Sequence, residues 1–150
     1  MVIQTARFGE IDIDPEGIIN IEEGLLGFPE ENRFCLLETK PGSPFRWFQA
    51  VDRGELAFLV INPYDFFSDY EIFLEDEVAE EMMLAKPEDA AVLALVSIQD
   101  AESLTANLVG PVVVNTRTGK GMQVVLDGER YSTRHLIASQ EQDAAASPAA

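Results

Sequence analysis

The chain has 150 residues, 47% of them hydrophobic, so it is long enough to bury the core of one domain and lacks a disordered composition. Its 27 acidic and 10 basic residues give a net charge of −17, which argues against binding to nucleic acids or anionic membranes, because both need clustered positive charge. A basic protein partner is favoured instead, although solubility alone also accounts for an acidic chain.

Cysteine usage and the absence of targeting segments indicate the compartment. The only cysteine, Cys35, lies in an apolar segment and is expected to be a buried, inert thiol that cannot form an internal disulfide. The first residues lack the pattern of a secretory signal, and no apolar run approaches the ~18 residues of a membrane span. We therefore expect a cytoplasmic protein that does not bind membranes.

Short apolar segments alternate with turn-forming residues through the first 63 residues. Ile11 and Ile13 alternate with aspartates, as in a half-buried strand, and Gly, Pro and Asn residues separate one segment from the next. The pattern predicts strands at 2–7, 11–13, 18–21, 33–38, 45–51 and 56–61.

An aromatic and acidic loop is predicted at 64–70, followed by an extended segment at 71–74. Residues 75–85 form the one convincing helix, because apolar side chains recur at helical spacing and acids occupy its first turn. Pro87 ends this helix, and 90–98 is predicted to be a buried strand. The stripe consists of Leu74, Val78, Met82 and Ala85.

The most apolar and β-branched stretch is 104–115, which Gly110-Pro111 divides in two. Since proline cannot donate to a ladder, Pro111 is expected to open a strand, and 112–114 suits a strand covered on both faces. A hairpin follows through 116–121. A second hairpin is predicted around Asp127-Gly128, between 124–126 and Tyr131.

Many short strands with one helix predict a mainly β protein, a small antiparallel β-barrel or sandwich-like domain with one short helix. We expect a single domain at 1–137. The small and polar residues 138–150 are expected to form a disordered C-terminal tail.

Asn107 is a polar amide inside the apolar run. Asparagine favours irregular backbone, so its side chain is expected to satisfy backbone groups at a bulge beside the Gly-Pro bend. The alternative is that Asn107 points into a partner-binding site.

No motif supports catalysis or a cofactor. Asp12 to Glu23 has the oxygen spacing of a calcium loop but lacks flanking helices, so two strands joined by a turn are favoured and no metal is expected. The single histidine, His135, favours a structural or surface role. Carboxylate pairs are frequent in such an acidic chain, and none is singled out for acid–base chemistry.

The strongest charge pattern lies between Arg53 and Lys86, where the chain has nine acids and no base, while 111–136 has a surplus of two bases. Aromatic residues interleave with acids at 64–70, and such aromatics either anchor a protein partner or plug one end of a barrel. The candidate partner-binding residues are Tyr64, Asp65, Phe66, Phe67, Asp69, Tyr70, Glu71 and Asn107.

Several segments, in this order and spacing, resemble the family of the flagellar assembly factor FliW. The resemblance covers nearly the whole chain except the tail, and its most specific part is the stretch 104–115. The resembling segments are Gly24-Leu25-Leu26-Gly27-Phe28 with Phe34, Pro44 to Gln49, Leu56 to Val60 with Asn62-Pro63 and Asp69-Tyr70, Leu104 to Leu108 with Pro111 to Asn115, and Gln123 to Leu126 with Tyr131, Arg134 and His135.

The resemblance implies a small β-barrel-like fold without catalysis that binds flagellin in the cytoplasm. It also implies binding to CsrA, an RNA-binding translational regulator, whose repression of flagellin synthesis is relieved once flagellin export frees the factor. An alternative is an acidic nucleic-acid mimic that occupies the RNA site of a basic regulator directly. A metal-dependent hydrolase is a third reading, for which the sequence offers one His and one Cys as nitrogen or sulfur ligands.

Overall fold

Eleven short strands and one short helix make up most of the computed structural model, which describes residues 1–100, 103–126 and 131–139. Single-turn 3-10 helices at Pro15–Gly17, Pro63–Asp65 and Pro87–Asp89 join some of them, and the helix is α1 at Asp76–Glu81. The strands are β1 Val2–Thr5, β2 Gly9–Asp12, β3 Ile19–Ile21, β4 Arg33–Leu37, β5 Phe45–Ala50, β6 Ala57–Ile61, β7 Ala90–Asp100, β8 Ser103–Ala106, β9 Val112–Asn115, β10 Lys120–Gln123 and β11 His135–Ser139.

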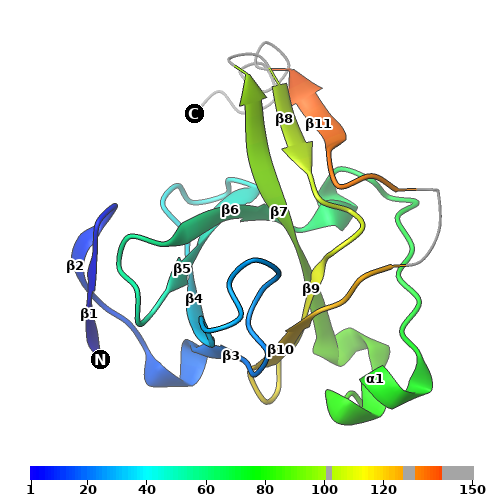
Figure 1. Ribbon diagram of the computed structural model, residues 1–150, viewed down its shortest axis with the longest axis horizontal. Coiled ribbons are helices and arrows are strands. Elements are labelled where there is room, and N and C mark those ends of the chain that lie inside the picture. The colour runs from blue at the N-terminus through cyan, green and yellow to red at the C-terminus, as the bar shows by residue number, and fades with distance from the viewer. Residues whose placement is uncertain (101–102, 127–130, 140–150) are drawn as a thin grey trace.

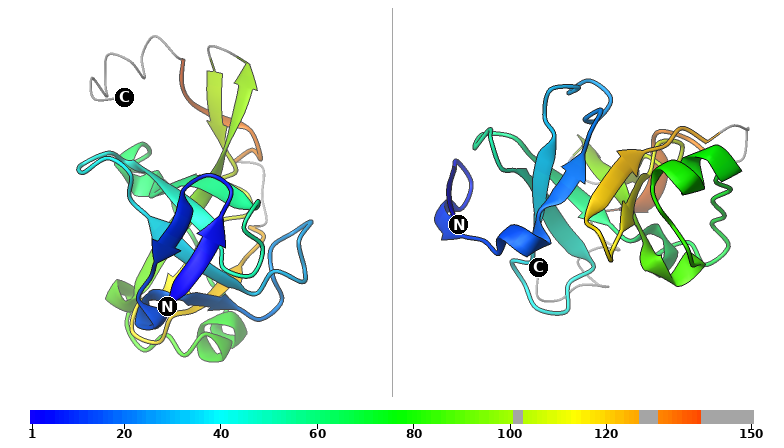
Figure 2. Two further views of the ribbon diagram at one scale, coloured as in Figure 1. Left: turned by 90° about the vertical axis from the view of Figure 1, so that its left-hand side faces the viewer. Right: turned by 90° about the horizontal axis from the view of Figure 1, so that it is seen from below.

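Seven strands close into a barrel in the order β7, β6, β5, β4, β3, β10, β9, with β9 pairing back onto β7. Strand β7 is long enough to close the barrel, because Ala90 to Leu93 pair with β9 while Ala94 to Val96 pair with β6. The outer part of β7 continues past the barrel and pairs with β8, which pairs with β11, so these three strands form a projecting arm (Figure 1). The β1–β2 hairpin and α1 lie on opposite sides of the barrel (Figure 2).

The barrel interior is filled by apolar side chains from facing strands. Phe34 and Phe48 stack with ring centroids 4.5 Å apart, and both are fully buried. Val112 and Val114 of β9 pack in this same core. Val113, between them, points to the other face of β9 and packs in a cluster with Met82, the residue that follows α1, so the strand is covered on both faces.

The structure confirms the mainly β fold with one short helix. It also confirms the seven strands predicted along 2–61 and 90–98, whose ends agree to within two residues. The predicted hairpin through 116–121 is present and joins β9 to β10. One barrel pair departs from the prediction of an antiparallel barrel, since β3 and β10 run parallel. The chain passes through six other strands between them, and no tight turn therefore fixes their relative direction.

Several predicted elements differ in the structure. The helix ends at Glu81 rather than Ala85, because Met83 adopts a left-handed φ of 58°, and Ala85 is exposed instead of lying in the apolar stripe. Residues 71–74 belong to no strand.

The second predicted hairpin is wrong as far as it is described. Residues 124–126 form no strand and instead donate backbone hydrogen bonds to the 109–111 bend, from Val124 N to Pro111 O and from Leu126 N to Val109 O. Its turn, Asp127-Gly128, lies outside the described residues. Strand β11 runs through Ser139, so the predicted boundary between domain and tail falls inside a strand, and 140–150 lie outside the described residues.

Candidate protein-binding groove

The segment that follows β6 is held against the barrel by short polar contacts. Asn62 caps the 3-10 turn by accepting from the Tyr64 N–H at 3.0 Å, and Pro63 provides the restricted φ that this turn needs. The Tyr70 hydroxyl donates to the Leu108 carbonyl at 2.6 Å. The Glu71 N–H donates to the Tyr131 hydroxyl at 2.9 Å, so two tyrosines fix the path of the chain toward α1.

The structure divides the predicted aromatic residues into core and surface groups. Tyr70 is 3% exposed, and burial raises the pKa of its phenol well above the usual value. Phe66 and Phe67 are half-buried in the same apolar cluster, where the ring of Phe67 meets the edge of His135 at 4.9 Å between centroids. These three rings pack with Ile61 and Ala94 on the outer face of β6 and β7, in a cluster separate from the barrel interior, so they do not plug the end of the barrel. Tyr70 is corrected from a contact residue to a core residue that positions its neighbours.

The remaining predicted residues of this loop are at the surface. Tyr64 is 41% exposed, and burial of part of its ring and the neighbouring Tyr131 raise the pKa of its phenol. Asp65, Asp69 and Glu71 are exposed as well. Their role in binding a partner stays a prediction.

Asn107 has the local role that its position in the sequence predicts. Its side-chain oxygen accepts from the N–H groups of Val109 at 3.1 Å and Gly110 at 2.9 Å. The amide thereby fixes the bend before β9, and its half-buried side chain is a structural support of the surface rather than an exposed contact.

A groove of about 900 Å³, here called the aromatic groove, runs between the segment leading into α1 and the chain after β10. Phe73 on one wall is 84% exposed and Val125 on the other is 65% exposed, although large apolar side chains in such positions are normally covered. The lining residues are Tyr64, Tyr70 to Glu75, Val78, Met122 to Leu126 and Tyr131.

Most groove residues are absent from the sequence-based candidates, and Phe73 and Val125 are the most exposed apolar side chains among those that were missed. The signal for Phe73 is the alternation from 70 to 75, which places it on the same side as Glu71 and Glu75, while Tyr70, Ile72 and Leu74 turn toward the protein. Val125 carries no such signal, because its neighbours suggest a buried strand.

The aromatic groove combines apolar anchors with negative charge. Glu71 and Glu75 line it and are exposed, and no Lys, Arg or His is among the described lining residues. Exposed aromatic and aliphatic groups surrounded by a charged rim are the usual composition of a protein-binding hot spot. The arrangement suits a partner that presents apolar side chains flanked by basic ones.

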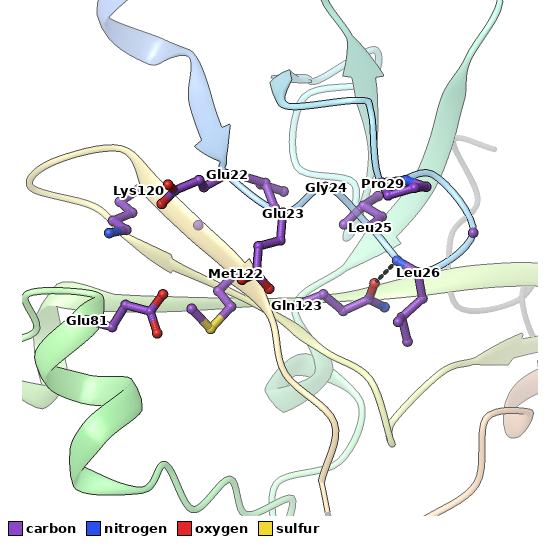
Figure 3. Close-up of a pocket in the computed structure, with 13 residues that line it drawn as sticks. Glu22, Glu23, Gly24, Leu25, Leu26, Pro29, Glu81, Lys120, Met122 and Gln123 are labelled. Carbon is purple, nitrogen blue, oxygen red and sulfur yellow. Dashed lines mark hydrogen bonds between the residues drawn. The ribbon is translucent and has the colours of Figure 1, made fainter.

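A smaller hollow of about 210 Å³ adjoins the aromatic groove, and the two share Met122 and Gln123 (Figure 3). The Leu26 N–H donates to Gln123 Oε1 at 2.7 Å, while Gln123 Nε2 donates to the Gly110 carbonyl at 2.8 Å. Gln123 thus ties the 22–29 loop to the bend that Asn107 supports. The loop presents Leu26, 65% exposed, beside the groove.

Gly24 allows this loop to close on itself. Its φ is +70°, and a Cβ at this position would stand 2.4 Å from the Phe28 carbonyl oxygen. Only glycine fits such a close backbone approach in the left-handed region. The Gly-Leu-Leu-Gly-Phe segment therefore builds the wall beside the groove.

The Asp12 to Glu23 stretch contains the end of one strand, a 3-10 turn and a second strand, which confirms the prediction of two strands joined by a turn. Asp12 pairs with the amine of Met1 at 2.9 Å, and Asp14 caps the turn by accepting from the Glu16 N–H. Among residues 1–100, 103–126 and 131–139, no group of three or more His, Cys, Asp or Glu side chains is arranged to hold a metal. The described helix is also too short to cross a membrane.

Fold and groove together define a small β-barrel with an apolar groove that carries exposed acids. Residues 2–137 match the family described as FliW protein. The chain is 46% identical over 139 residues to the flagellar assembly factor FliW of Magnetococcus marinus, covering 91% of this chain and 85% of the relative. It is 41% identical over 138 residues to that of Syntrophus aciditrophicus, covering 91% and 87%.

A crystal structure of the flagellar assembly factor FliW superposes with a TM-score of 0.83 at 34% identity, covering 91% of this chain and 96% of the other. The chain therefore belongs to the FliW family of flagellar assembly factors.

Proposed function

We propose that this chain is a non-enzymatic, cytoplasmic assembly factor that binds flagellin and, once released from it, binds and antagonises a CsrA-type regulator of flagellin translation. The family assignment supports a role in flagellar assembly. The two partners are an expectation from the family resemblance, and neither membrane nor nucleic acid is a direct ligand in this proposal.

The observation that carries the proposal is the exposure of Phe73, at 84%, beside Val125 in an acid-lined groove. An uncovered phenylalanine is costly in water and is used by interaction proteins as an anchor that a partner buries. The net charge of −17 supports fast association with a basic surface, because long-range attraction raises the encounter rate. We therefore assign the aromatic groove to the regulator.

The decisive experiment measures association and dissociation of purified CsrA and flagellin by surface plasmon resonance at two salt concentrations. Phe73→Ala should raise the CsrA dissociation rate by about 30-fold, corresponding to a hot spot of ~2 kcal/mol. Because Phe73 is exposed, the variant should keep its melting curve. Ile98→Ala, at an equally apolar and 69% exposed site on the arm, is the matched control.

A second pair of variants distinguishes the effect of the exposed charges from the effect of the apolar anchor Phe73. Replacing Glu71 and Glu75 by glutamine should slow association and flatten its salt dependence, since exposed charges act mainly over about a Debye length of ~8–10 Å. Glu38→Gln serves as the control at an exposed acid away from the groove. If folded Phe73→Ala and the double glutamine variant both bind CsrA like the parent, the groove is not the regulator interface.

A competition experiment between this protein and RNA for CsrA distinguishes allosteric antagonism from mimicry of a nucleic acid. A mimic must exclude RNA from the regulator, whereas an allosteric antagonist permits a transient ternary complex. Adding flagellin to the preformed complex further tests partner exchange, because release of CsrA is expected if both proteins need the same groove.

A further inference from the structure

A second cavity lies behind one wall of the aromatic groove, between α1 and the barrel. Its volume is about 430 Å³, within the range of small-molecule sites. Tyr64, Ile72 and Leu74 line both cavities, whereas Phe73 lines only the groove. This cavity, here called the Lys86 pocket, is therefore a separate space with a shared wall.

The Lys86 pocket has an apolar body and one charged group. Eight of its ten lining residues are apolar, including Leu84 beyond α1 and Val92 of β7. The other two are Lys86 and Tyr64, and both residues are exposed to solvent. Chemically, the pocket matches a ligand with a hydrocarbon part and a single polar head.

The positive charge of Lys86 decides which kind of polar head group the ligand carries. Lys86 is the first base after a stretch of 32 residues without one, yet it forms no ion pair with any residue the structure describes. The chain has 27 acids and 10 bases, yet no carboxylate of the described residues lies within ion-pair distance of this ammonium group. An anionic head is complementary to it, and a cationic head is repelled.

We propose that the Lys86 pocket binds a small amphiphilic monocarboxylate, with the hydrocarbon part against Leu84 and Val92 and the carboxylate paired with Lys86. Burial of the apolar part supplies affinity, and the lysine supplies the preference for a negative head. This proposal does not depend on the identity of the flagellar partners. The ligand proposal and the proposed function can therefore fail independently of each other.

The test is a titration of the full chain with octanoate, octan-1-ol and octyltrimethylammonium, followed by amide chemical shifts in NMR. Octanoate should bind most tightly and shift residues around the pocket. Lys86→Gln should weaken octanoate about two- to five-fold, the range of an exposed ion pair, and leave octan-1-ol unchanged. Lys40→Gln, at an exposed lysine in a distant loop, should change neither ligand.

A filling variant checks the location of the ligand. Ala79→Leu places a larger side chain in the pocket from α1, where leucine is well tolerated in a helix, and should abolish binding of both octanoate and octan-1-ol. If that variant does not fold, Ala85→Leu fills the same pocket from the exposed segment after α1.

Three results would overturn the proposal. One is the absence of saturable octanoate binding, and a second is an equal effect of Lys86→Gln on octanoate and octan-1-ol. The third is displacement of octanoate by a leucine-terminated peptide that binds more tightly than octanoate itself, which would assign the pocket to the terminus of a protein chain.

Discussion

Asn115 has no exposed surface, and its side chain bonds in two directions. Its Nδ2 donates to the carbonyls of Met82 at 3.0 Å and Met83 at 3.1 Å, and its Oδ1 accepts from the Arg117 N–H at 2.9 Å. One amide thereby joins the end of α1 to the turn after β9. Buried polar side chains such as this one specify a unique arrangement because every bonding group needs a partner.

Arg33 and Asp52 form a two-point ion pair at the barrel surface, in which Arg33 Nε donates to Asp52 Oδ2 at 2.9 Å. The hydrogen bond from Arg33 holds the pKa of the Asp52 carboxyl below its usual range. Because the folded pKa lies below the unfolded one of about 3.9, the pair contributes stability above that pH and loses it as the pH falls through the folded pKa.

We therefore expect Asp52→Asn to lower the melting temperature slightly at pH 7, by the equivalent of ~0.2–1 kcal/mol, since Asp52 is 54% exposed and solvent screens the pair. The difference from the parent should shrink below about pH 4 and vanish once the pH has fallen below the folded pKa of Asp52. Thermal melts across this range measure it. Asp69→Asn, at an exposed acid in no ion pair with a described residue, is the control and should leave the melting temperature at pH 7 unchanged.

At the scale of the element, α1 is a six-residue helix whose end is better fixed than its start. Glu75 at the N-cap makes no side-chain capping bond. At the other end, the Leu84 N–H donates to Ala79 O and the Met83 N–H to Glu80 O, both at 3.0 Å, which is the pattern of a Schellman motif. Such a short helix depends on this cap and on packing of Met82 against the barrel.

Met83 occupies the left-handed position of this motif with φ 58°, where glycine is normally preferred. Met83→Gly should therefore stabilise the protein by about 0.4–1 kcal/mol, since Met83 is 58% exposed and loses little packing. Chemical denaturation at constant m-value measures the change. Val125→Gly, at a 65% exposed residue without positive φ, should give no gain. A destabilised Met83→Gly would mean that the Met83 side chain packs more than its exposure indicates.

At the scale of the whole molecule, β9 joins the two layers of packing. It closes the barrel by pairing with both β10 and β7, and its four residues are all buried. Inside, Val112 and Val114 meet the barrel core, while outside Val113 meets the cluster under α1. The aromatic groove and the Lys86 pocket both lie over this outer cluster.

Val113→Asp should unfold the domain, because it buries a carboxylate without a partner in a strand on which both layers depend. Circular dichroism and a cooperative melting curve provide the measurement. Val125→Asp, at a 65% exposed valine on the groove wall, should leave the fold intact. A soluble Val113→Asp protein that melts cooperatively would contradict the central position of β9.

The order of short apolar segments and turn residues was enough to predict β1 to β7, the single helix and the double-sided burial of 112–114, because strand formation follows alternation and local turn chemistry. It did not predict β11, which pairs with β8 instead of forming a hairpin with 124–126. The family resemblance likewise came from segment order and spacing alone. The role of Asn107 was predictable for the same reason, since it acts on backbone groups two and three residues away.

Contacts between distant segments were decided only by the tertiary structure. The parallel pairing of β3 with β10, the burial of Tyr70 through Leu108, and the end of α1 at Asn115 each join residues more than 30 positions apart. The exposure of Phe73 and Val125 belongs to the same class, because the same residue types would be buried in another arrangement of the same strands. Sequence thus determined local elements, and closure of the barrel decided which side chains remain on the surface.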